Sequence, residues 1–160
     1  MCVKKLNLLL TIVLIALLVL LLYGATQSGP RIVFVDVNRI TQEYTKMVEL
    51  NRRYSADVSY YQSKLDEMSK ELEEMRNRGA SQAELERKQA EILARKQQYE
   101  QILQSEYEPK MKQILEEIAQ KIDKYAKMMG YDYILNKAAL VYGDDAYDIT
   151  NQLIGFLNAQ

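Results

Sequence analysis

"EEMRNRGASQAELERK" (residues 73–88) holds the chain-reversal signal within a very long run of helix-forming residues. Gly79 can adopt the left-handed backbone conformation that ends a helix, because glycine has no Cβ. Ser81 followed by Glu84 has the spacing of a capping box, in which the two side chains satisfy the first turn of a new helix. The stretch therefore predicts a helical hairpin with Gly79 and Ser81 at its tip, near residues 78–81.

The segment before this tip carries the repeat of a coiled coil. In alternating steps of four and three residues from Ile40 to Met75, ten of eleven positions are apolar and only Asn51 is polar. Asn38 has a side chain suited to capping the N-terminus of a helix. The pattern therefore predicts one continuous outward helix from Asn38 to the tip.

The returning segment is less regular than the outward one. We call the row of repeat positions that packs against the other helix the seam. In the seam of the returning segment, from Leu85 to Leu103, Gln89 and Lys96 are polar, which predicts weak packing in the outer half of the hairpin. Beyond Leu103 the apolar spacing becomes an eleven-residue repeat that continues through Pro109. Because the repeat does not stop there, we expect Pro109 to kink the helix rather than end it. Pro109 is therefore the hinge candidate, although a static bend explains the same residue.

The two flanks of the hairpin have the composition of a small β-rich body. Runs of β-branched and aromatic residues predict three short strands: RIVFVDV (31–37), YDYIL (131–135) and AALVY (138–142). DITNQLIGFLN (148–158) then predicts a short helix with Asp148 near its N-terminus.

These segments predict an α+β fold that is mostly α. Residues 26–37 and 130–160 would form a small β-rich oligomerisation body, and residues 38–129 a long antiparallel coiled-coil hairpin, the arm. Three short strands and one short helix are less than usually folds alone. The strand edges would also be open. We therefore expect several copies to associate through the body, in a number that the pattern does not give.

The N-terminal segment has the pattern of an export signal. Lys4 and Lys5 precede an almost wholly apolar run over residues 6–22, LNLLLTIVLIALLVLLL, and small residues follow it. We expect residues 1–25 to be a removed signal peptide. An uncleaved membrane anchor is the alternative, because the run is nearly long enough to span a bilayer. In both cases the rest of the chain lies outside the cytoplasm, and membrane contact is limited to residues 6–22.

Charge and residue types exclude several kinds of function. Without its two N-terminal lysines the chain has 19 basic and 22 acidic residues, which argues against nucleic acid and anionic lipid as general partners. The chain has no histidine, its one cysteine is Cys2, and it lacks a phosphate-binding glycine motif. We therefore expect no enzyme activity, no cofactor and no metal site. Asp144, Asp145 and Asp148 suit a turn and a helix N-terminus better than a calcium site.

Some apolar residues of the arm fall outside the coiled-coil seams. Tyr60 is expected to lie across the hairpin from Leu93 and Ile102, so that these side chains widen an apolar stripe along the arm. Large exposed apolar area usually marks an interaction surface. A sister arm and an unfolded chain would both suit such a stripe. The candidate binding residues are Val48, Leu50, Tyr60, Leu93 and Ile102.

Four features of the chain occur together in one known family. They are the N-terminal signal segment, the opening strand RIVFVDVNRI, the uninterrupted hairpin, and the closing stretches IDKYAKMMGYDYILN and ALVYGDDAYDITNQLI. With these features the chain resembles the OmpH-like family of periplasmic chaperones for outer-membrane proteins, over nearly all of residues 31–160. The closing stretches are the most specific part, since any charged heptad sequence resembles any other.

This resemblance implies a homotrimer, in which three bodies form a shared β-barrel and three arms surround a cavity. It also implies that the arms hold unfolded outer-membrane proteins in the periplasm without ATP, with the five apolar residues above as client-binding candidates. The best-known family member is strongly basic, whereas this chain is slightly acidic. No lipopolysaccharide-binding residues are therefore carried over.

The sequence also fits a function of another class. An uncleaved helix over residues 6–22 would make the chain a membrane-anchored coiled-coil spacer or adaptor, which binds one folded envelope partner. A chaperone would have a free N-terminus near residue 26 and would suppress the aggregation of several unrelated unfolded membrane proteins. A spacer would do neither.

Overall fold

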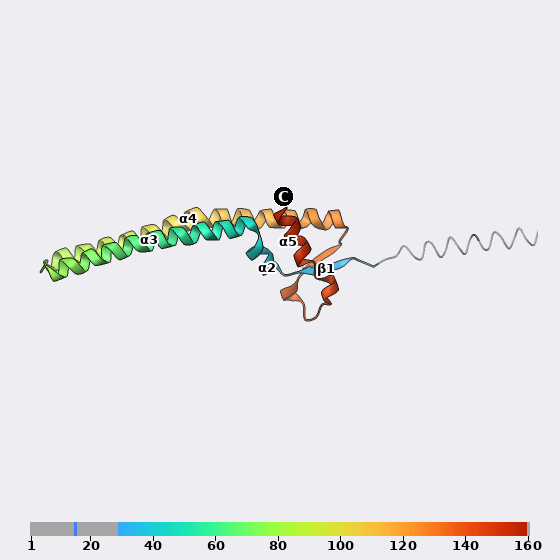
Figure 1. The fold of residues 1–160 in the computed structure, drawn as a ribbon, viewed down its shortest axis with the longest axis horizontal. Helices are drawn as coiled ribbons and strands as arrows, with labels where there is room; N and C mark the ends of the chain where they lie inside the picture. The colour runs from blue at the N-terminus through green and yellow to red at the C-terminus, as the bar shows by residue number, and fades with distance from the viewer. Residues whose placement is uncertain (1–14, 16–28, 160) are drawn as a thin grey trace, which may run out of the picture.

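A small body and a long helical arm make up the part of the chain that the computed structural model describes, which is residue 15 and residues 29–159 (Figure 1). The predicted signal peptide or anchor over residues 1–25 lies outside the described residues, apart from Ile15. Within the described part, no helix combines the length and the apolar character that crossing a membrane requires.

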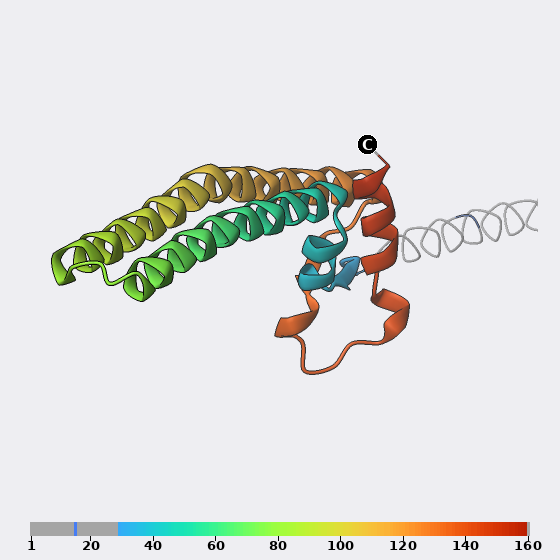
Figure 2. The same ribbon diagram turned by 60° about the vertical axis from the view of Figure 1, so that its left-hand side comes forward.

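Two antiparallel helices form the arm. α3 (Thr45–Asn77) runs outward from the body, and α4 (Gln82–Met129) returns along it and continues over the body (Figure 1). The predicted fold class, α+β and mostly α with a long helical hairpin, is confirmed. α4 continues through Pro109, and the helix pair bends gradually along its length (Figure 2). Pro109 is exposed, so water can serve the carbonyl group that it leaves without a backbone partner. Its role as a hinge stays a prediction.

Backbone geometry at the tip explains how the chain reverses. Gly79 has a φ of 77°, in the left-handed region. The Ala80 N–H donates to the Met75 carbonyl at 3.0 Å, as in the Schellman motif that ends many helices. Ser81 and Glu84 then form a complete capping box, in which the side chain of each accepts from the backbone N–H of the other. The tip therefore pairs its own backbone groups without contacts from elsewhere.

The body contains a two-stranded parallel sheet, β1 (Ile32–Val35) beside β2 (Tyr133–Asn136). On the other edge of β1, Phe34 forms a single parallel bridge to Asp148. β1 is therefore the central segment. Among the described residues, no strand pairs with the outer edge of β2.

Two short helices complete the body and share a core with the arm. α2 (Val37–Glu43) and α5 (Thr150–Asn158) lie near the inner end of the arm, its root (Figure 2). Ile40, Leu153 and Leu157 are at most 1% exposed. Burial of such a side chain contributes about 1.5–3 kcal/mol. The buried cluster also includes Ile118 and Tyr125 of α4, so the body has no core separate from the arm.

The predicted strand over residues 138–142 is absent. The Asn136 side chain accepts a hydrogen bond from the Ala138 N–H at 3.1 Å, which starts the short 3-10 helix η1 (Lys137–Ala139) instead. A sequence that favours a strand still needs a neighbouring strand to pair with. Val141 and Tyr142 have no such neighbour among residues 29–159, and they are 107% and 84% exposed. A second 3-10 helix, η2 (Asp145–Tyr147), precedes α5.

The outward helix is not continuous, contrary to the prediction. α2 begins at Val37 rather than after an Asn38 cap, because the Asp36 side chain accepts from the Arg39 N–H at 3.0 Å. α2 then ends at Tyr44, where a ψ of 120° interrupts the helical path before α3 begins. Tyr44 is 2% exposed, so this break lies inside the packed root of the arm.

Replacing Gly79 with Ala is expected to destabilise the tip by about 1 kcal/mol, because a Cβ disfavours the left-handed conformation. Hydrogen exchange of the amides over residues 75–88 should then accelerate about fivefold, while exchange in the body stays unchanged. Gly155→Ala is the matched control, since Gly155 lies in α5 with open space where a Cβ would be added. Unchanged exchange at the tip of Gly79→Ala would contradict the role given to Gly79.

Candidate functional site

The two sides of the arm differ in what lines them. Two grooves follow one side, which we call the open side. The root groove has a volume of about 520 Å³, and its lining includes Asn51, Tyr54, Leu103, Gln104, Tyr107 and Met111. The outer groove has a volume of about 400 Å³, and its lining includes Gln62, Leu65, Leu72, Ile92, Leu93 and Lys96.

Helical geometry places both grooves on the same side of the arm. On α3, Asn51 lines the root groove and Gln62 lines the outer groove, eleven residues and about three turns further on. On α4, Leu93 of the outer groove and Gln104 of the root groove are related in the same way. The two grooves therefore follow one another along the open side.

Apolar side chains are exposed along the open side. Val48 is 49% exposed and Leu93 is 58% exposed. Tyr54, Val58 and Met111 belong to the predicted seam, yet each is at least 37% exposed. A heptad repeat identifies the packed face of a helix but not how many helices cover it. In a two-helix arm, the partner helix covers only one side of a seam residue and leaves the other side in solvent. The sequence therefore did not predict that these three residues are exposed.

Ion pairs join the two helices on the opposite side, which we call the ion-paired side. Lys46 Nζ lies 2.7 Å from Glu117 Oε2, and Lys88 Nζ lies 2.8 Å from Glu71 Oε2. Lys46 precedes Asn51 of the root groove by five residues, a rotation of about 140° around α3. Charged groups on this side therefore pair across the seam. A groove of about 420 Å³ also lies here at the root, but charged and polar residues such as Lys46 and Glu117 make up most of its lining.

Hydrogen bonds between α3 and α4 shift the ionisation of two groups. The Lys46 ammonium, and after it the Tyr44 hydroxyl, lower the pKa of Glu117 to about 2. The Tyr107 hydroxyl donates to Asp57 Oδ2 at 2.5 Å, and this bond raises the pKa of Tyr107 to about 12. Both groups therefore keep one charge state near neutral pH.

Leu50 is buried within the arm, contrary to the prediction that it lies outside the seam. It is 7% exposed, whereas Asn51, the seam residue in the heptad count, is exposed. Leu50 lies three residues after the buried Met47, and such a pair shares one face of a helix. A small rotation of α3 thus buries the leucine and leaves the polar amide in water, which avoids an unpaired buried group.

The other candidates do not form one stripe. Tyr60 precedes Gln62 by two residues and Ile102 precedes Gln104 by two, and two residues turn a helix through about 200°. Both side chains therefore point away from the open side, with Tyr60 58% exposed and Ile102 half-buried. The expectation that Tyr60, Leu93 and Ile102 share one side of the arm is wrong.

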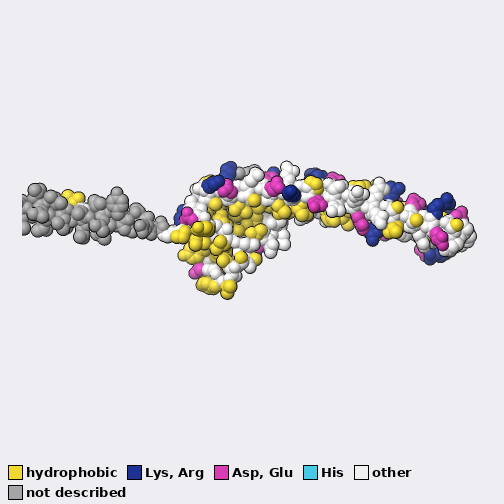
Figure 3. Space-filling view, turned by 180° about the vertical axis from the view of Figure 1, so that it is seen from behind, with side chains coloured by type: hydrophobic (Ala, Val, Ile, Leu, Met, Phe, Trp, Pro, Cys, Tyr) yellow, Lys and Arg dark blue, Asp and Glu magenta, His cyan; other side chains and the backbone are white. Residues whose placement is uncertain are grey.

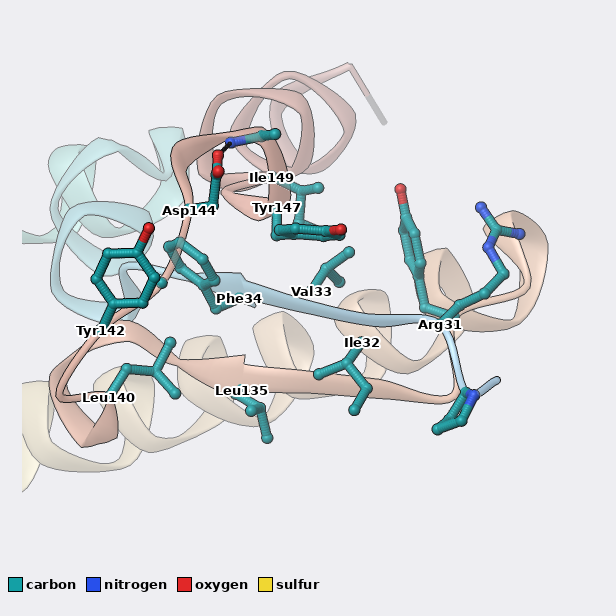
Figure 4. Close-up of a pocket in the computed structure, with 14 residues that line it drawn as sticks. Arg31, Ile32, Val33, Phe34, Leu135, Leu140, Tyr142, Asp144, Tyr147 and Ile149 are labelled. Carbon is teal, nitrogen blue, oxygen red and sulfur yellow. Dashed lines mark hydrogen bonds between the residues drawn. The ribbon is translucent and has the colours of Figure 1, made fainter. Parts of the chain in front are cut away.

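The body carries a second apolar surface, where yellow side chains gather in Figure 3. A groove of about 730 Å³, the body groove, is lined by β1, Leu135 of β2 and residues of the loop before α5. Figure 4 shows Phe34 and Tyr142 among the side chains that line this groove. Gly143 approaches Phe34 so closely that a Cβ would lie 2.7 Å from the ring. The groove stays open to solvent beside this loop, where Tyr142 and Tyr147 are 84% and 57% exposed.

Acidic residues near α5 have structural partners. The Asp144 side chain accepts from the Ala146 N–H at 2.9 Å. The Asp148 carboxylate accepts from the Thr150 N–H at 3.0 Å and from Lys137 at 2.8 Å. In residue 15 and residues 29–159, no three His, Cys, Asp or Glu side chains come together in a way that could hold a metal ion.

Comparison with known proteins gives one family. The family described as outer membrane protein (OmpH-like) matches residues 31–157. None of the curated proteins compared with the chain matches it. Among solved structures, a Caulobacter crescentus CB15 protein described as an OmpH-like outer membrane chaperone is 16% identical, with a TM-score of 0.47. The similarity covers 82% of this chain and 86% of that one.

Replacing Glu117 with Gln is expected to destabilise the root of the arm by about 1 kcal/mol at pH 7, a value discounted for solvent exposure. The pKa of Glu117 is lowered on folding from 4.5 to about 2. Its contribution is therefore fully present above pH 4.5 and is lost as the pH falls towards 2. Urea unfolding between pH 7 and pH 3 should show the two chains converging as the pH falls.

Glu116→Gln is the matched control, because Glu116 is the neighbouring carboxylate and is exposed. This variant should differ little from the wild-type chain at every pH. A Glu117→Gln difference that is the same at pH 7 and pH 3 would contradict the assigned ion pair.

Proposed function

The chain belongs to the OmpH-like family, and we propose that it is an ATP-independent holdase chaperone of the periplasm, which binds unfolded outer-membrane proteins between helical arms. The observation that carries this proposal is the open side of the arm. There Leu93 lines the outer groove and is exposed. Val48 precedes Asn51 of the root groove by three residues, so it is exposed on the same side of α3. The ion pairs between the helices lie on the other side. The N-terminal basic and apolar pattern supports export to the periplasm.

The open side suits an unfolded β-barrel chain better than a folded partner. Strands of outer-membrane barrels alternate apolar and polar residues. The root groove offers a matching mixture, with Leu103 and Met111 as apolar contacts and Glu100 and Gln104 as polar neighbours. Scattered contacts of this kind require no defined client conformation and tolerate many sequences.

Release without ATP follows from the size of the contacts. Apolar burial contributes about 25 cal/mol per Å² removed from water, so one half-exposed side chain adds little by itself. Several arms that act on the same client bind it tightly together, because each further contact forms at high effective concentration. Each contact can still break separately, so a client that folds into the membrane can leave stepwise.

We propose that the body joins the copies whose arms enclose the client, three of them by the family resemblance. The body groove, the unpaired outer edge of β2 and the fully exposed Val141 support association through this part. The extended residues beyond η1 would then pair with a strand of another copy, since the described part of one chain offers them none.

Replacing Val48 and Leu93 together with Ser is expected to weaken binding of an unfolded β-barrel client about tenfold, or about 1.4 kcal/mol. The matched control is Tyr60→Ser with Ile102→Ser, which removes two apolar side chains from the other side of α3 and α4. This control should change the dissociation constant less than twofold. Fluorescence titration gives the constant, and light scattering gives the suppression of client aggregation.

Three outcomes would contradict this assignment of the client side. Larger weakening in the control pair would place the client on the ion-paired side. Normal binding by both pairs, together with loss of binding between 50 and 300 mM salt, would place it on the charged tip. Loss of assembly in the Val48 and Leu93 variant would make the open side an interface between arms and would favour the spacer function.

The chain should be an oligomer, with a trimer expected, at micromolar concentration in analytical ultracentrifugation. Replacing Val141 and Tyr142 with Ser should raise the dissociation constant of the oligomer at least tenfold. Both side chains are exposed in one chain and would be buried on association. The Val48 and Leu93 variant serves as the control with an intact body. A folded wild-type monomer at micromolar concentration would remove the enclosed cavity from the proposal.

A further inference from the structure

The break between α2 and α3 has no cause in the local sequence. Residues 37–50, VNRITQEYTKMVEL, contain neither Gly nor Pro, and the apolar repeat continues through them. Tyr44 nevertheless has a φ of −70° and a ψ of 120°, which is extended backbone. The Glu43 carbonyl and the Thr45 N–H therefore lose the partners that a continuous helix would give them.

The side chain of Asn158, at the C-terminal end of α5, takes the place of both partners. Its Oδ1 accepts from the Thr45 N–H and from the Thr45 hydroxyl, each at 2.9 Å. Its Nδ2 donates to the Glu43 carbonyl at 3.0 Å. An amide offers an acceptor and a donor at once, so one side chain caps the end of α2 and the start of α3.

Neighbouring groups hold the end of α5 at the break. Lys121 of α4 donates to the Leu157 carbonyl and to the Tyr44 hydroxyl, both at 3.1 Å. Leu157 and Tyr44 are 1% and 2% exposed, so they are firmly packed. Asn158 itself is exposed, and water competes for its hydrogen bonds. The amide is therefore the contact at this junction that opens most easily.

We propose that Asn158 is a reversible clasp that keeps α2 and α3 apart, and that its release lets residues 37–77 join into one helix. The uninterrupted apolar repeat favours the joined form, and the clasp favours the broken one. α2 runs steeply across the axis of α3 (Figure 2), so joining would turn the outer arm relative to the sheet. Because α4 continues from the arm into the core of the body, α4 must bend alongside α3 in this movement.

The length of the arm amplifies any change at this junction. α3 has 33 residues and is therefore about 50 Å long. A rotation of about 10° at Tyr44 would move the tip by about 9 Å. The clasp thus acts on the direction of α3 through a residue more than a hundred positions further along the chain, whatever the arm binds.

Distances between two spin labels test the clasp without any client. The labels are placed at Ser63→Cys on α3 and Gln152→Cys on α5, both exposed, in a chain that also carries Cys2→Ser. Mixing with excess unlabelled chain restricts the measured distances to single chains. The wild-type background should give one dominant distance, and Asn158→Ala should raise the population at a second distance about tenfold.

Two further variants make the test specific. Asn158→Asp keeps the acceptor for Thr45 but loses the donor to Glu43, so an intermediate rise is expected. Asn151→Ala is the matched control. Asn151 also joins α5 to α2, through Arg39 at 3.0 Å, but it does not touch the break. It should leave the single distance unchanged.

The proposal is overturned if Asn158→Ala and Asn158→Asp both keep the wild-type distance, because the break then needs no clasp. A broad distribution with loss of helix in circular dichroism overturns it as well, since the release then unfolds the junction instead of joining the helices. If Asn158→Ala does not fold, Asn158→Asp decides by the same criteria. A failure of client binding has no bearing on these distances.

Discussion

Two helices packed against each other can bury only the seam between them, and the other features of this structure follow from that limit. Seam residues such as Tyr54 and Met111 stay partly exposed because no third helix covers them in the part of the chain that the structure describes. The ion pairs between α3 and α4 lie on one side and stabilise the pair there. The other side retains two grooves with mixed apolar and polar linings, which none of the described residues fills.

Tyrosine is the residue that makes such a thin arm stable. Tyr61 stacks on Tyr99 with ring centroids 4.4 Å apart, and Tyr54 meets Tyr107 edge-on at 5.1 Å. Aromatic pairs contribute about 0.5–1.5 kcal/mol beyond the area that they bury. The hydroxyl at the end of the ring can reach water or a polar partner, as Tyr107 reaches Asp57. A half-exposed tyrosine therefore stabilises the seam without leaving a buried polar group unpaired.

The candidate site was only partly predictable from the sequence. Val48 and Leu93 could be found because they fall outside the heptad positions, and both are exposed. The sequence could not show that Leu50, unlike these two residues, is buried. A small rotation of α3 about its axis decides whether Leu50 or Asn51 enters the seam. Met111 could not be found at all, because a position in the repeat reveals which face it occupies but not how much of that face is covered.

The sequence by itself determined the features that depend on residues a few positions apart. Gly79 and the Ser81 capping box reverse the chain with their own backbone groups, and the apolar repeat selects the packed face of each helix. Only the tertiary structure decided the break at Tyr44, the loss of the strand over residues 138–142 and the side of the arm left open. These features depend on partners remote in the sequence or absent from a single chain. Asn158 lies 113 residues from the backbone that it caps, and no local pattern encodes such a contact.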